Sequence, residues 1–186
     1  TIWSLFHCFN QFTVYENVEV LANGKIRTGD AVDTRHEFNL YGNFTNYGDV
    51  QFTNRSTANY TAEAADGIVD VNFLSATRDQ TATLEGPTRF YRIAIEKGIS
   101  STYELFIEAT DAAYFELFGY ASEGHGDVAQ LAENNNSLGL AYGTVRIGNN
   151  IDIPRLNGGG NYNVSENAIL WVDGGTVTKP AGTAVV

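Results

Sequence analysis

The nine residues FTNYGDVQF, 44–52, contain the pattern that decides the fold. An apolar residue is followed after a few positions by glycine, and a β-branched residue stands two places beyond that glycine. The same pattern recurs in LANGKIRTG (21–29), LAYGTVRIG (140–148) and WVDGGTVTK (171–179). Glycine allows a corner at which φ is positive, and the next strand then resumes its inward-facing alternation. A pattern that recurs at intervals of one coil predicts a solenoid.

The spacing of the glycines supports this prediction. Gly24 and Gly48 lie 24 positions apart, and Gly143 and Gly175 lie 32 apart. Both gaps fit single coils of a β-helix with variable loops inserted at one corner. We therefore predict an all-β fold, a β-helix (β-solenoid) that forms one domain over 1–186; the resemblance described below implies its right-handed parallel form. The AGTAVV segment at 181–186 is typical of a strand interrupted within its pattern, so we expect a fragment of a longer chain.

Short alternating segments bounded by Gly, Asn, Asp or Pro predict many strands and almost no helix. The expected strands are 13–20, 36–46, 49–54, 68–73, 80–86, 89–98, 102–109, 144–153, 168–174 and 176–179. One short helical insertion is expected at 126–136, where Asp127 can act as the N-cap. A β-sandwich is the alternative, but it would need hairpins with two-residue turns, and the sequence offers few.

The composition of the chain limits the classes of partner that it can be expected to bind. The chain has 22 acidic and 11 basic residues, a net charge of −11. A duplex-binding surface needs a basic patch, so nucleic acid is not expected as a partner. No apolar run approaches the roughly 20 residues that span a bilayer, so membrane insertion is not expected either. The only cysteine, Cys8, excludes an intramolecular disulfide.

Two long segments carry a resemblance to known proteins. TATLEGPTRFYRIAIEKG (81–98) and the segment from SEGHGDVAQ to the end (122–186) resemble a recurring unit of large secreted surface proteins of Bacteroidetes-type bacteria. Those proteins look like right-handed parallel β-helices, and many are exported by the type IX system. The resemblance implies a secreted or cell-surface location and a stalk, adhesin or glycan-contacting role. It implies surface glycans, other cell-surface proteins or the outer-membrane export machinery as partners, and it brings no catalytic residues.

Candidate sites for chemistry are few. Gly158–Gly160 lack the lysine and the following helix of a phosphate loop, so we interpret them as a flexible corner. Glu123, His125 and Asp127 alternate in EGHGD and could hold a cation, although Asp127 is also the expected helix cap. No resident cofactor is expected, and calcium is the one candidate ion.

A cluster of Asp30, Asp33 and Arg35 imitates the aspartates and basic residue with which some β-helix enzymes cleave acidic polysaccharides. A solvated corner loop is the preferred interpretation. A polysaccharide lyase or glycoside hydrolase on the same scaffold therefore stays the first alternative to a structural or adhesive role. No catalytic residue is assigned, and the enzyme question stays open.

Aromatic residues are the candidates for ligand binding. Exposed rings on one face of a solenoid would stack on sugars, as in a carbohydrate-binding module, whereas inward rings would only fill the core. Tyr91 lies on the same side of its strand as Ile93 and Ile95, so we predict that it is buried. Trp171 lies on the same side as Asp173, opposite Leu170 and Val172, so we predict that it lies on the outer face. The candidate ligand-binding residues are Tyr120, Tyr142, Tyr162 and Trp171.

Overall fold

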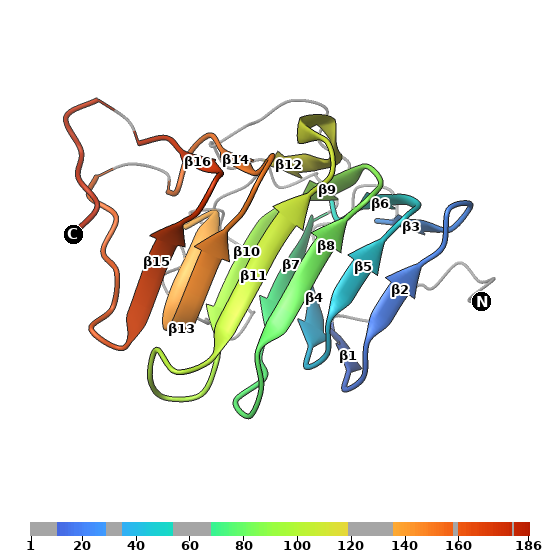
Figure 1. The fold of residues 1–186 in the computed structure, drawn as a ribbon, viewed down its shortest axis with the longest axis horizontal. Helices are drawn as coiled ribbons and strands as arrows, with labels where there is room; N and C mark the ends of the chain where they lie inside the picture. Colours follow the sequence, from blue (N-terminus) through green and yellow to red (C-terminus); the bar gives the residue numbers. More distant parts are fainter. Residues whose placement is uncertain (1–10, 29–34, 54–67, 119–135, 158–159, 180) are drawn as a thin grey trace.

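The computed structural model describes residues 11–28, 35–53, 68–118, 136–157, 160–179 and 181–186. Its strands stack in sequence order around one axis, and every pair of neighbouring strands is parallel. The chain is therefore the expected parallel β-helix and not a β-sandwich. In Figure 1 the coils advance from right to left while the chain climbs in the front sheet and descends in the rear sheet, so the solenoid is right-handed.

Each complete coil contributes one strand to each of three sheets. Sheet A, at the rear of Figure 1, contains β1 (Gln11–Val14), β4 (Arg35–Leu40), β7 (Ile68–Phe73), β10 (Arg92–Glu96) and the first half of β13 (Leu138–Ile147). Sheet B, at the front, contains β2 (Val18–Val20), β5 (Phe44–Asn46), β8 (Gln80–Leu84), β11 (Glu104–Ala109), the second half of β13 and β15 (Ala168–Val172).

Sheet C closes the coil. It contains β3 (Lys25–Arg27), β6 (Asp49–Gln51), β9 (Thr88–Phe90) and β12 (Phe115–Leu117). The pair β14 (Asp152–Ile153) and β16 (Thr176–Val177) follows β12 at the top of Figure 1. One 3-10 turn, η1 (Ala112–Tyr114), is the only helical element in the described part of the chain, with Asp111 as its N-cap.

Insertions concentrate at the corner where sheet C leads into sheet A. Only Tyr91 separates β9 from β10. Longer segments separate the corresponding strands of the other coils, namely 28–34, 52–67 and 118–137. The prediction of variable loops at one corner is confirmed. The helix predicted for 126–136 lies outside the described residues except for Asn136.

Glycine is required at the corner between sheets B and C. A Cβ added at Gly48 would collide with the carbonyl oxygen of Gly24 and lie 2.6 Å from that of Leu21. Gly24 and Gly48 are thus equivalent corners of adjacent coils, as predicted. Gly143 and Gly175 are not equivalent. Gly143 lies opposite Ala168 at the bend of β13, whereas Gly175 lies against the carbonyl oxygen of Gly148.

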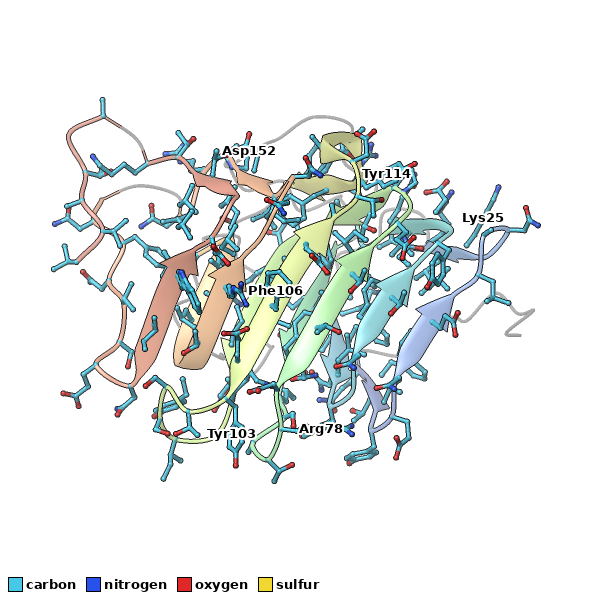
Figure 2. All side chains as sticks on the ribbon, in the orientation of Figure 1. Lys25, Arg78, Tyr103, Phe106, Tyr114 and Asp152 are labelled. Atoms are coloured by element: carbon cyan, nitrogen blue, oxygen red, sulfur yellow. The ribbon has the colours of Figure 1, made fainter. Side chains whose placement is uncertain are left out.

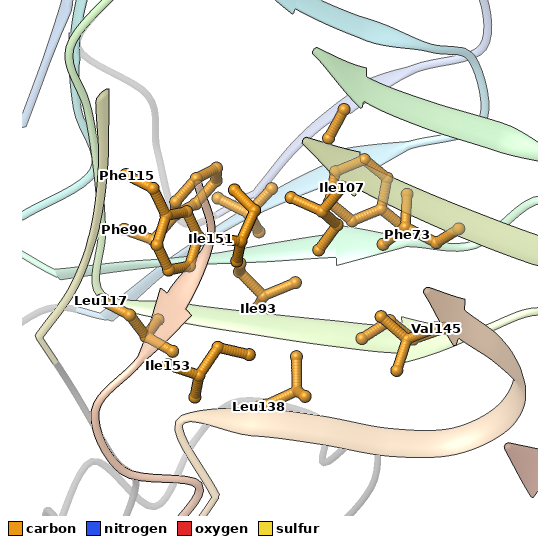
Figure 3. Close-up of a cluster of buried hydrophobic side chains, with 14 of the residues drawn as sticks. Phe73, Phe90, Ile93, Ile107, Phe115, Leu117, Leu138, Val145, Ile151 and Ile153 are labelled. Atoms are coloured by element: carbon orange, nitrogen blue, oxygen red, sulfur yellow. The ribbon is translucent and has the colours of Figure 1, made fainter. Parts of the chain in front are cut away.

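The inward side chains form a continuous core from coil to coil. Phenylalanine rings stack along it, with ring centroids 5.5 Å apart for Phe12 and Phe38 and for Phe52 and Phe90, and 5.8 Å apart for Phe90 and Phe115. Figure 3 shows the aliphatic part of the core beside these rings. Each coil buries its apolar residues against the next coil, so the coils depend on one another for stability.

The corner between sheets A and B is held by polar side chains. The side-chain oxygen of Asn17 accepts a hydrogen bond from the backbone N–H of Asn43 at 2.9 Å, and that of Asn43 accepts one from Thr81 at 3.0 Å. Asp79 accepts one from the N–H of Glu104 at 2.7 Å. These bonds satisfy backbone donors that the turn leaves without strand partners.

Candidate functional site

Three side chains on adjacent strands, two of them half-buried, form a ladder on the outer face of sheet B. Phe106 of β11 lies opposite Arg146 of β13, which lies opposite Trp171 of β15. Figure 2 shows Phe106 on the front of this sheet. The Arg146 guanidinium carbon lies 4.6 Å from the centroid of the Phe106 ring and 4.5 Å from that of Trp171. The prediction that Trp171 faces outward is confirmed, since 46% of the residue is exposed.

Carboxylates hold the arginine in this position. Arg146 Nε donates to Asp173 Oδ2 at 2.7 Å, and its Nη2 forms an ion pair with the same oxygen. Glu104 Oε1 lies 3.8 Å from Nη1. A guanidinium over an indole ring is attracted to the ring face. Arg146 thus fixes one face of the indole. We call Glu104, Phe106, Arg146, Trp171 and Asp173 the Trp171 face.

A shallow cleft of about 320 Å³, lined by both polar and apolar side chains, lies near the start of β15. Tyr142, one of the predicted ligand-binding residues, is half-buried and lines it. The other lining residues are Asn136, Leu140, Ala141, Asn163, Val164, Ser165, Glu166 and Asn167. The cleft combines one aromatic ring with amide, hydroxyl and carboxylate groups, a combination suited to a hydroxyl-rich ligand.

The interpretation of Tyr162 as a ligand-binding residue is wrong. The residue is only 2% exposed, and its ring packs in the core. Its hydroxyl donates to the carbonyl oxygen of Leu138 at 2.8 Å. A buried ring with a satisfied hydroxyl cannot stack on a ligand. Tyr91 is buried as predicted.

Several predicted site residues lie outside the described part of the chain. They are Tyr120, Glu123, His125, Asp127, Asp30, Asp33, Gly158 and Gly159. Gly160 has φ of 75° with no atom within 4 Å of an added Cβ, as a corner glycine would. The described residues include no group of three His, Cys, Asp or Glu side chains that could hold a metal ion. They also include no helix long and apolar enough to cross a membrane.

Other ionisable groups are buried or half-buried in the solenoid. Arg92 Nη1 lies 3.4 Å from Asp70 Oδ2, and both side chains are buried. Lys97 is also buried, and its Nζ donates to Gln80 Oε1 at 2.7 Å. Desolvation lowers the pKa of Lys97 to about 8, although the Asp79 carboxylate opposes this shift. Burial also lowers the pKa of His36 and raises that of Glu96.

Sequence reasoning found Trp171 but missed Arg146 and Phe106. In each strand the alternation shows which residues point outward, and Arg146 alternates with the core residues Val145 and Ile147. What brings these three side chains together is the register between coils. That register depends on the lengths of the corners and insertions, which alternation does not encode.

Comparison of the chain with known protein families, curated proteins and solved structures finds no match.

Proposed function

We propose that this chain is a structural and adhesive β-helical segment of a secreted or cell-surface bacterial protein, and that it contacts glycans through the Trp171 face. The observation that carries the proposal is the exposed indole ring, held in place from one side by Arg146. A ring fixed before binding loses little conformational entropy when a ligand stacks on it. The resemblance of 81–98 and 122–186 to bacterial surface proteins supports the location.

The charges favour a neutral glycan. Arg146 is the only cation on the Trp171 face, and Asp173 and Glu104 already surround it. The chain as a whole carries a net charge of −11. An acidic polysaccharide would be repelled by this field. The same repulsion disfavours the alternative of a lyase that cleaves acidic polysaccharides.

The test is a binding measurement on immobilised neutral and acidic polysaccharides. We expect the chain to bind a neutral polysaccharide and Trp171→Ala to bind it at least about fivefold more weakly, because a stacking ring contributes roughly 1 kcal/mol beyond its buried area. Tyr15→Ala is the matched control, since Tyr15 is an exposed ring (69%) in the first coil. Preferential binding of acidic polysaccharides, or equal loss in both variants, would contradict the proposal.

A further inference from the structure

The ladder of parallel strands is interrupted between β13 and the coil that follows it. The N–H of Gly143 donates to the carbonyl oxygen of Asn167 at 3.2 Å, and from there onward β13 pairs with β15. Earlier in β13 the contact is made by a side chain, since the Tyr162 hydroxyl donates to the carbonyl oxygen of Leu138 at 2.8 Å. The cleft that Tyr142 lines lies between these two bonds, and both of the coils that form it are described.

The first half of β13 forms one wall of this cleft. Ile93 lies opposite Leu138 and donates its N–H to the carbonyl oxygen of Ser137 at 3.0 Å. A residue in a parallel pair thus bonds to the neighbours of the residue opposite it. Ile95 lies opposite Leu140, so it bonds to the neighbours of Leu140 and not to Leu140 itself. The N–H and C=O groups of Leu140 therefore point away from β10 and toward the cleft.

The next coil forms the opposite wall. The N–H groups of Tyr162 and Val164 donate to carbonyl oxygens of the segment 184–186, at 2.8 and 2.7 Å. Successive residues of an extended strand point their backbone groups to opposite edges. The N–H and C=O groups of Asn163 therefore point to the other edge, toward β13 and the cleft.

Backbone groups of both walls are thus available to an occupant of the cleft. Within the described part of the chain, no group bonds to the N–H or C=O of Leu140 or of Asn163 across the cleft. Donors and acceptors of the backbone require partners. The hydrogen bonds at the two ends of the cleft join its walls, so a peptide strand has no path through it. The occupant that fits is a compact molecule that both donates and accepts.

The lining selects a neutral sugar among such molecules. A hydroxyl group both donates and accepts, so it can bond to the N–H and the C=O groups of either wall. The half-buried ring of Tyr142 offers an apolar surface to a sugar ring, and Ser165 adds a further hydroxyl. A carboxylate or phosphate only accepts. The exposed carboxylate of Glu166 in the lining and the net charge of −11 would also repel it.

We propose that this cleft binds a single neutral sugar residue, whose hydroxyl groups bond to the backbone of Leu140 and Asn163 and whose ring packs against Tyr142. The cleft is separate from the Trp171 face. Tyr142 precedes the bend of β13 and lies opposite β10, whereas Arg146 follows the bend and lies opposite β11. The cleft therefore gives the chain a second sugar site, which does not depend on Trp171.

The probes are glucose, galactose and mannose, each titrated into the isotope-labelled full chain, with glucuronate as the anionic counterpart. We expect a neutral sugar to shift the amide resonances of Leu140 and Asn163 saturably and to slow hydrogen exchange at both amides. The amide of Gly143 is already bonded to Asn167, so its exchange should not change. Glucuronate should bind more weakly than the neutral sugar.

Two variants of the chain test the location. Tyr142→Ala should bind the sugar at least about fivefold more weakly, because it removes the ring against which the sugar packs. Asn163→Pro should also weaken binding, because proline removes the N–H that points to the cleft and leaves those of Tyr162 and Val164 in place. Circular dichroism checks that both variants fold.

Two further variants serve as controls. Tyr47→Ala, which removes a ring that is 40% exposed elsewhere, and Trp171→Ala should both bind the sugar as the wild type does. The proposal is overturned if no neutral sugar shifts the amides of Leu140 and Asn163, if glucuronate binds equally well, or if both cleft variants bind like the wild type. Loss of sugar binding in Trp171→Ala would also overturn it, because the sugar would then lie on the Trp171 face.

Discussion

Lys97 is the residue whose burial has the clearest consequence for stability. Its ammonium group donates to Gln80 and to the carbonyl oxygen of Arg78, at 2.7 and 3.1 Å. Desolvation lowers its pKa from 10.5 to about 8 in the folded protein. Between these two values the unfolded chain binds more protons than the folded chain. The contribution of Lys97 to the free energy of unfolding therefore rises with pH through this window.

We expect the difference in unfolding free energy between the wild type and Lys97→Met to shift in favour of the wild type from pH 8 to pH 10. The upper limit of the shift is about 1.4 kcal/mol per pH unit, the slope for one proton. Urea denaturation at each pH measures it. Lys25→Met, at an exposed lysine, is the control and should show no such trend. A difference independent of pH would show that Lys97 keeps an ordinary pKa.

At the scale of the element, the corner between sheets B and C depends on glycine. We expect Gly48→Ala to lower the free energy of unfolding by about 2 to 3 kcal/mol, because the new Cβ would overlap the backbone of the preceding coil at Gly24 and Leu21. Thermal or urea denaturation measures this loss.

Gly182→Ala separates this steric cost from the cost of backbone conformation. Gly182 has φ of 80° and no atom within 4 Å of an added Cβ, so its substitution should cost only about 1 kcal/mol. Equal losses at Gly48 and Gly182 would mean that coil stacking does not limit the size of the corner residue.

The elements themselves could be predicted from the sequence more reliably than their ends. The predicted strand at 68–73 has its observed bounds. Each of the predicted strands at 36–46 and 89–98, in contrast, covers two separate strands of the structure. Alternation continues through Tyr41–Asn43 and Tyr91, because these corner residues follow the apolar and polar pattern of a strand. Only the stacking of coils shows that the chain turns there.

At the scale of the whole molecule, the sequence predicted the architecture, and only part of the site followed from it. Trp171 was placed outside because its own strand alternates. Tyr162 was grouped with the candidate exposed rings, yet its ring fills the core near the end of the solenoid. The Trp171 face joins β11, β13 and β15, and no single strand reveals that contact.

The most direct measurement of the central claim is to incubate the chain with a neutral polysaccharide and follow both retention and product size, with and without a calcium chelator. The account predicts that the polysaccharide is retained through Trp171 and that mass spectrometry finds no shortened products. Release of shorter oligosaccharides would contradict the adhesive role and favour an enzyme on this scaffold. Loss of that release on chelation would point to a calcium-dependent enzyme.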